Sequence, residues 1–214
     1  MKVAVIDFET TGLNPETDYP TEVAVKLVDF DNPAGPQETA YSSMIKLPEG
    51  VELSEYITDL TGLTTEVLNE QGTDITTVIE ELIEFLGEDC EEETVFVAHN
   101  ANFDLGFLAI HFGLMPKAYV CTRSVAIMTA PEHNASLNQL YERLFSKGEK
   151  QTHRAMGDVE MTFKVFMYYI QTEGPEALTF MVNRLVVMPD RGLVYEPPYA
   201  RLLDFSKKYE VKKK

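Results

Sequence analysis

The sequence predicts an α/β protein in which a mixed sheet is covered by helices. Near the N-terminus, three apolar, β-branched runs are joined by short turns, which predicts an antiparallel meander. Further along the chain, short buried runs alternate with segments of helical periodicity, which is typical of a sheet with helical cover. The chain has 214 residues, of which 44% are hydrophobic, so it is long enough for one domain with a sizeable core.

Five segments are expected to be strands, because each is short, apolar and rich in β-branched residues. They are residues 3–6, 22–30, 39–47, 94–98 and, as an edge strand, 119–121. The turn between the second and third strands is marked by Asn32-Pro33-Ala34-Gly35-Pro36.

Apolar residues recur every three or four positions over 75–86, as in a helix. Eight further segments, this one included, are expected to be helices. They are residues 54–58, 64–69, 75–86, 102–112, 123–128, 136–145, 157–170 and 176–187. The acidic run at 88–93 is expected to be a solvated loop. Since the periodicity fades after Pro189, we expect one main domain over residues 1–174, and a C-terminal helix and tail of unknown role over 175–214.

The net charge limits the choice of partners. A formal charge of −17 argues against a nucleic-acid or anionic-membrane binder, since such proteins usually carry a basic surface. No apolar run reaches the roughly 18 residues that span a bilayer, and no signal segment precedes the first strand. The only cysteines are Cys90 and Cys121, so a disulfide framework is not expected. We therefore expect a cytoplasmic protein with no membrane partner.

Four acids stand where predicted strands end or predicted helices begin. They are Asp7 and Glu9 after the first strand, Asp104 after the fourth, and Asp158 at the start of the long helix. In an open α/β sheet such positions gather along one edge. Two carboxylates about 6 Å apart would repel by roughly 3 kcal/mol. Two divalent cations such as Mg²⁺ or Mn²⁺ would remove that repulsion, and paired metals serve in-line phosphoryl displacement.

A histidine precedes the last of these acids. His153 lies five residues before Asp158, and histidine titrates near neutrality, so it can take a proton from an attacking water. The other histidines, His99, His111 and His133, are expected to be structural or to face solvent.

Three segments, in this order, resemble the motifs of a known family. They are DFETTG from residue 7, HNANFD from residue 99 and HRAMGD from residue 153. Together they are similar to the motifs of the DEDDh branch of the DEDD exonucleases, which includes the proofreading epsilon subunit of bacterial DNA polymerase III, ribonuclease T and oligoribonuclease. The resemblance covers residues 1–172 and implies a ribonuclease H-like five-stranded mixed sheet with one antiparallel strand. It makes residues 1–174 an exonuclease domain that removes nucleoside 5′-monophosphates from 3′ ends with two metal ions.

The resemblance also assigns roles to individual residues. It makes Asp7, Glu9, Asp104 and Asp158 the metal ligands and His153 the general base. The residues that would contact the 3′-terminal nucleotide are Thr10, Thr11, Gly12, Leu13 as an apolar wedge, Thr61, Gly62, Asn100 and Phe103. The chain departs from many members at Cys121, where they carry aspartate, but that position is not a metal ligand.

Three interpretations remain open. The first is a metal-dependent 3′-to-5′ exonuclease on single-stranded nucleic acid, with DNA favoured over RNA trimming. The second is a proofreading subunit of a DNA polymerase, and the third is an inactive nucleic-acid-binding module, which the complete set of catalytic positions opposes. Because the chain is acidic, we expect a distributive enzyme. The cations nearest the motifs are Arg123, Lys147, Lys150 and Arg154.

Overall fold

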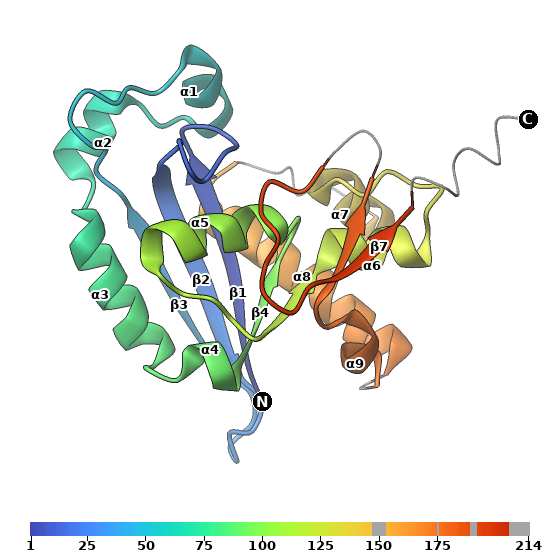
Figure 1. The fold of residues 1–214 in the computed structure, drawn as a ribbon. Helices are drawn as coiled ribbons and strands as arrows, with labels where there is room; N and C mark the ends of the chain where they lie inside the picture. The colour runs from blue at the N-terminus through green and yellow to red at the C-terminus, as the bar shows by residue number, and fades with distance from the viewer. Residues whose placement is uncertain (147–152, 175, 189–191, 206–214) are drawn as a thin grey trace, which may run out of the picture.

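The computed structural model describes residues 1–146, 153–174, 176–188 and 192–205. Its centre is a five-stranded sheet in the order β3-β2-β1-β4-β5 (Figure 1). The strands are β1 (Lys2–Thr10), β2 (Pro20–Asp29), β3 (Gln37–Met44), β4 (Thr94–Ala98) and β5 (Ala118–Cys121). β2 runs antiparallel to both neighbours, and β4 runs parallel to β1 and β5. The predicted class, a mixed sheet with one antiparallel strand, is confirmed.

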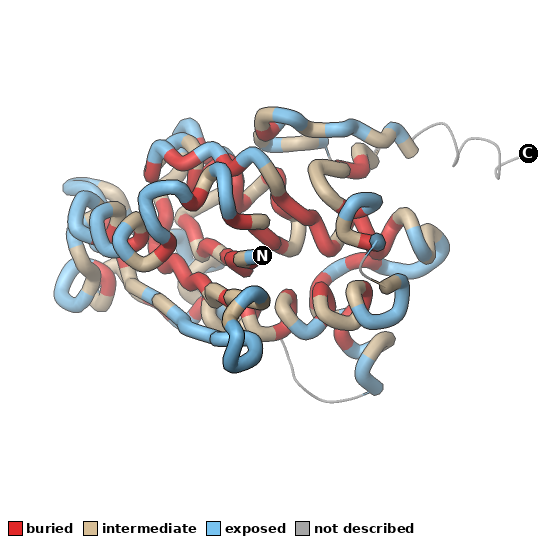
Figure 2. Tube along the Cα trace, turned by 90° about the horizontal axis from the view of Figure 1, so that it is seen from below, coloured by how far each residue is buried: buried red, intermediate tan, exposed pale blue. Residues whose placement is uncertain are grey.

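Helices cover both faces of this sheet. They are α1 (Glu55–Thr61), α2 (Thr65–Gln71), α3 (Ile75–Leu86), α4 (Cys90–Glu93), α5 (Asn102–Phe112), α6 (Thr122–Thr129), α7 (Leu137–Phe145), α8 (Ala155–Glu173) and α9 (Ala177–Met181). In Figure 2 the buried residues lie in the interior of the molecule, and the exposed residues lie around them.

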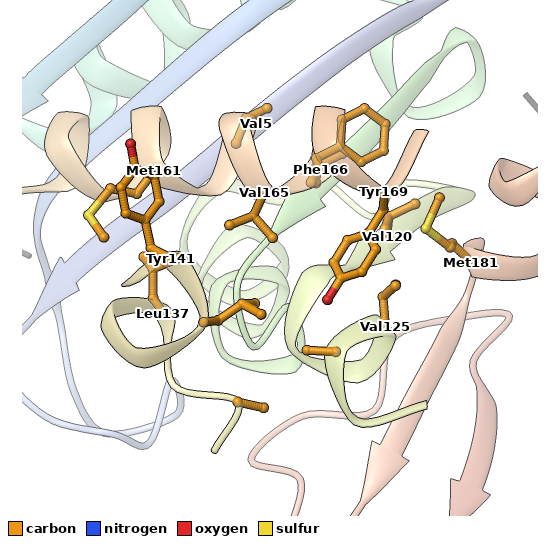
Figure 3. Close-up of a cluster of buried hydrophobic side chains, with 14 of the residues drawn as sticks. Val5, Val120, Val125, Leu137, Tyr141, Met161, Val165, Phe166, Tyr169 and Met181 are labelled. Carbon is orange, nitrogen blue, oxygen red and sulfur yellow. The ribbon is translucent and has the colours of Figure 1, made fainter. Parts of the chain in front are cut away.

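The alternation of side chains along β1 divides the core between the two faces. Val3 and Val5 pack against α8 together with α6 and α7, in the cluster drawn in Figure 3. Ala4 and Ile6 pack on the other face, against α3 and α5. Each large aliphatic side chain buried in this way stabilises the fold by roughly 1.5–3 kcal/mol. The side chains that follow Ile6 in β1 therefore also alternate between the face that α8 covers and the face that α5 covers.

The prediction of a helix over 176–187 is wrong beyond its first turns. α9 ends at Met181, and β6 (Arg184–Val187) pairs in parallel with β7 (Arg201–Asp204). Asn183 has a left-handed backbone, with φ at 58°, and its side chain bonds the edge of β5. Its Oδ1 accepts from the Tyr119 N–H at 2.9 Å, and its Nδ2 donates to the Lys117 carbonyl at 2.8 Å. The helix ends there because this asparagine satisfies polar groups that an edge strand leaves unpaired.

Two smaller features are the acidic run 88–93, which differs from expectation, and a lobe that lies apart from the sheet. The acidic run 88–93 is not only a loop, because Cys90 is buried and starts the short helix α4. α1 and α2 form a separate lobe over a small cluster of Leu47, Leu63 and Leu68. Among the described residues, no helix is both long and apolar enough to cross a bilayer.

Candidate active site

β1 places two acids on the face of the sheet that α8 covers. The strand does not end at Ile6, as expected, but continues to Thr10, so Asp7 and Glu9 lie within it. Both continue the alternate set begun by Val3 and Val5, which packs against α8. The Asp-x-Glu spacing thus puts both carboxylates on one face, while Phe8 between them is buried on the other.

Asp104 reaches β1 from the first turn of α5, where it is 1% exposed. β4 pairs with β1 only as far as Val5, so the edge of β1 is open beyond that point. There the Phe8 N–H donates to Asp104 Oδ1 at 3.2 Å. Asp104 Oδ2 is buried with no hydrogen-bond partner among the described residues. A buried carboxylate oxygen without a donor is costly, which is a reason to expect a cation beside it.

Asp158 and His153 come from the start of α8. Asp158 lies in the first turn and is 3% exposed. Ligand atoms of Glu9, His153 and Asp158 all lie within 4.8 Å of one another. His153 adopts a left-handed backbone with φ at 49°, a region that residues other than glycine seldom occupy. The histidine and two of the four acids are therefore within reach of one shared ion or water.

The crowding of carboxylates raises their affinity for protons. Burial, and then the charges of Asp104, Asp158, Glu9 and Glu22, hold the pKa of Asp7 well above its usual range. Burial and the neighbouring acids likewise raise the pKa of Glu9 to about 8. Burial raises the pKa of Asp104, against the opposing effect of the Phe8 N–H bond. Without a counter-charge this group would hold protons near neutrality.

A divalent cation fits this donor set. The ligands are carboxylate oxygens, which suit hard ions such as Mg²⁺ and Mn²⁺, and one oxygen of Asp104 has no competing donor. An ion among them would replace the bound protons and cancel the mutual repulsion.

The loop after Glu9 is tied back on itself. The Thr10 hydroxyl donates to the Gly12 carbonyl at 2.6 Å, and Thr11 Oγ1 accepts from the Tyr19 N–H at 2.9 Å. A Cβ at Gly12 would lie 2.4 Å from Asp18 Oδ2, so a larger residue there would displace the Asp18 side chain. Leu13 is 70% exposed. The loop is ordered by its polar groups and leaves one large apolar side chain in solvent.

The other predicted substrate residues have structural contacts of their own. The Thr61 hydroxyl donates to the Ile57 carbonyl at 2.9 Å, and Gly62 ends α1 with φ at 73°. Asn100 Oδ1 accepts from Asn102 at 3.0 Å. Phe103 is half-buried, with its ring centroid 5.0 Å from that of Phe107. α1 lies at the end of the sheet where β1 enters its loop (Figure 1).

Among the other histidines, two have bonds that hold segments together. His99 Nδ1 and Nε2 lie 2.9 Å from Thr122 Oγ1 and from the Ala135 carbonyl. His111 Nε2 lies 3.0 Å from the Pro15 carbonyl. These contacts link the site edge to the loop before α7 and to the loop after β1.

Sequence reasoning missed Glu22, which is 5% exposed and lies directly opposite Glu9 in the β1–β2 pairing. It binds Arg154 through two hydrogen bonds, from Nε at 2.9 Å and from one Nη at 2.7 Å. Arg154, one of the four cations nearest the motifs, is therefore engaged with Glu22, and Lys147 and Lys150 lie outside the described residues. In the sequence, the only signal for Glu22 was an acid at the first position of an apolar strand. The pairing register of that strand was needed to interpret it.

Known proteins match most of the chain. The family model RNase_T, described as an exonuclease, matches residues 4–166. The PolC-type DNA polymerase III of Thermotoga petrophila is 35% identical over 173 residues, covering 78% of this chain and 12% of the polymerase. The PolC-type enzyme of Staphylococcus haemolyticus is 29% identical over 179 residues, covering 78% of this chain and 11% of the polymerase. The chain thus spans only 11–12% of the length of these relatives.

Solved exonucleases share the fold. Exonuclease I of E. coli, in a zinc-bound complex with single-stranded DNA, superposes with a TM-score of 0.66 at 16% identity, over 84% of this chain and 42% of that one. The nuclease domain of 3′hExo, a DEDDh family member bound to rAMP, gives 0.65 at 19% identity, over 79% and 92%. Because the family model matches residues 4–166, most of this chain, the chain belongs to the RNase_T exonuclease family.

Proposed function

We propose that this protein is a metal-dependent 3′-to-5′ exonuclease that hydrolyses the terminal phosphodiester bond of single-stranded nucleic acid and releases nucleoside 5′-monophosphates. One observation carries the proposal. Three elements distant in sequence, β1, α5 and α8, bring buried and half-buried carboxylates together beside a histidine, where burial and then the charges of the neighbouring acids raise the pKa of Glu9 to about 8. Two divalent ions, Mg²⁺ or Mn²⁺, would be held by Asp7, Glu9, Asp104 and Asp158.

The chain's own residues divide the work of hydrolysis. Divalent ions held by these acids would supply Lewis acidity and would offset charge on the attacking and leaving oxygens. His153 takes the proton of the attacking water and lies close enough to Glu9 and Asp158 to act at the same phosphate. Leu13, exposed in the loop between β1 and β2, offers an apolar face for the terminal base.

DNA is the favoured substrate. The two relatives described above are DNA polymerases by name, and one structural neighbour is a complex with single-stranded DNA. RNA remains the alternative, since another neighbour holds rAMP. The choice depends on contacts to the 2′-hydroxyl, which the three motifs alone do not distinguish.

The test uses 5′-labelled DNA and RNA oligomers of one sequence, incubated with Mg²⁺, with Mn²⁺ or with EDTA. We expect shortening from the 3′ end in single-nucleotide steps, with either metal and not with EDTA. Asp7→Asn should abolish it, whereas Glu80→Gln, which neutralises an exposed acid on α3, should not. Activity that survives Asp7→Asn, or that persists in EDTA, contradicts the proposal.

A second function is favoured by the similarity to PolC-type polymerases. We propose that the exonuclease works beside a DNA polymerase, which would supply the basic surface that this acidic chain lacks overall. Tagged protein should then co-purify with a polymerase, and the isolated chain should act distributively on a long single strand. Removal of hundreds of nucleotides per encounter by the isolated chain would argue against the distributive mode.

The cysteines support a reducing compartment such as the cytoplasm. Cys90 and Cys121 are both buried and unpaired with one another.

A further inference from the structure

We propose that Glu22 is a positioning residue for catalysis, which acts through Arg154 to hold the start of α8 and so the approach of His153 and Asp158 to Glu9. The inference rests on the proposed function, and no motif includes Glu22. It follows from a buried contact between β2 and the segment that links the proposed base to its helix.

Glu22 contacts both the side chain and the backbone of that segment. Besides its two bonds to Arg154, Glu22 Oε2 accepts from the Ala155 N–H at 3.1 Å. One carboxylate thus fixes a guanidinium plane and the first backbone donor of α8. His153 directly precedes Arg154, and Asp158 follows within the first turn of the helix.

The backbone at His153 needs such a restraint. Its φ of 49° lies in a region that persists in non-glycine residues only where the surroundings hold it. Arg154, the next residue, returns to extended backbone, with φ at −124°, before the helix begins. The bidentate bond to Glu22 fixes the side chain at this change of direction, and a lysine could not reproduce the planar fork.

A buried glutamate at this position is electrostatically unfavourable unless it serves to hold the start of α8. It lies opposite Glu9, and its charge raises the pKa of both Asp7 and Glu9. Arg154 partly offsets this by lowering the pKa of Glu9. An apolar residue on β2 would avoid both a buried carboxylate and the added repulsion, and the burial of a charge is costly even when the charge is paired. We infer that Glu22 is used for geometry.

The competing explanation is that Arg154 simply contacts a phosphate of the substrate. Its side chain is 46% exposed and one Nη takes no part in the bonds to Glu22. Removal of a phosphate contact raises KM, whereas misplacement of the base lowers kcat. The two explanations therefore differ in which kinetic constant changes.

A second ion pair between β2 and α8 provides a matched control. Lys26 Nζ lies 2.8 Å from Glu160 Oε1, which joins the same strand to the same helix outside the four-acid cluster. Glu160→Gln weakens the attachment of α8 without touching His153, Arg154 or the four acids. It should lower the melting temperature slightly and leave kcat unchanged.

The experiment measures kcat and KM for Glu22→Ala, Arg154→Ala, the double variant and Glu22→Gln, which keeps the shape and one acceptor if the alanine variant fails to fold. We expect kcat to fall on the order of 10²-fold in Glu22→Ala and Arg154→Ala, with KM changed less than about threefold, since small displacements of a catalytic group have costs of that size. The double variant should be no slower than the slower single one, and Glu22→Gln should fall between wild type and Glu22→Ala. His153→Ala should cost far less in the Glu22→Ala background than in the wild type.

Three results would overturn the inference. One is an unchanged kcat with only a lower melting temperature, as for Glu160→Gln. Another is a raised KM in Arg154→Ala that Glu22→Ala does not share. The third is a full additive cost of His153→Ala in the Glu22→Ala background. Failure of the proposed function is recognised separately, because Asp7→Asn would then remain active.

Discussion

The two helices that carry acids into the site begin in similar ways, but different contacts hold their first residues. α5 and α8 each start two residues after a left-handed position, Asn100 with φ at 74° and His153 with φ at 49°. At α5 the contacts are uncharged amides. Asn102 donates to Asn100 Oδ1 and accepts from the Val194 N–H at 2.9 Å. At α8 the contact is a charge pair between the buried Glu22 and the partly exposed Arg154.

This difference indicates that Asp104 is placed rigidly, whereas the placement of His153 and Asp158 is adjustable. Asparagine adopts the left-handed region with little cost, so α5 presents Asp104 with uncharged amide bonds alone. His153 lies on a segment whose direction depends on a residue of another strand, and the strength of that contact depends on charge. We therefore expect changes at the α5 start to affect stability, and changes at the α8 start to affect turnover.

The largest expected effect is shared by the two helices. Asp104→Asn and Asp158→Asn each remove one proposed metal ligand, and nucleotide release should fall by at least about 10³-fold. The metal-free melting temperature should hold or rise, because each change removes one of several crowded buried charges. Thermal melts in EDTA and in Mn²⁺ check this, and the gain on adding Mn²⁺ should shrink in both variants. A large gain in either would mean that its acid does not bind metal.

The next effect belongs to α8 alone. His153→Ala should lower kcat by about 10²–10⁴-fold, the usual contribution of a general base. Titration with Mn²⁺ should give an affinity close to that of the wild type, because the histidine acts on water. A clear loss of Mn²⁺ affinity would instead make His153 a ligand, which its distance of 4.8 Å or less from Glu9 and Asp158 ligand atoms also permits.

Stability without metal should fall as pH rises. The pKa of Glu9 is about 8 in the folded chain against 4.5 for an ordinary glutamate, so between these values the folded state holds more protons than the unfolded state. The free energy of unfolding in EDTA should therefore decrease from about pH 4.5 to about pH 8. Mn²⁺ should raise the melting temperature more at pH 8 than at pH 6, because binding displaces those protons.

Glu9→Gln is the matched control for this profile. Without the titrating group the decline in EDTA should be shallower. If wild type and Glu9→Gln give the same slope, the decline comes from the general negative charge of the chain and not from the site.

The sequence predicted the sheet and the acids for a common physical reason. Short-range patterns decide them, because β-branched runs define the strands and the acids are expected where those runs end. The structure extends β1 to Thr10, and Asp7 and Glu9 share a face because strand side chains alternate. Glu22 and Arg154 lie 132 positions apart, and their contact exists only because β2 pairs with β1 in one register beneath α8. Apolar spacing over 176–187 predicted a helix because periodicity carries no information about Asn183 bonding the open edge of β5.

The C-terminal tail, whose role the sequence left open, contributes the smallest expected effect. Asn102 is 5% exposed and joins Val194 of the tail to Asn100. Asn102→Ala leaves these partners unsatisfied, and should lower the free energy of unfolding by about 1–3 kcal/mol. Because Asp104 keeps its bond to the Phe8 N–H, the kcat of this variant should stay within about threefold of the wild type. For Glu22→Ala, by comparison, we expect kcat to fall on the order of 10²-fold. Denaturant melts and single-turnover rates on the two variants measure both quantities. Equal losses of turnover would mean that both helix starts depend on distant contacts, and that the distinction between rigid and adjustable placement does not hold.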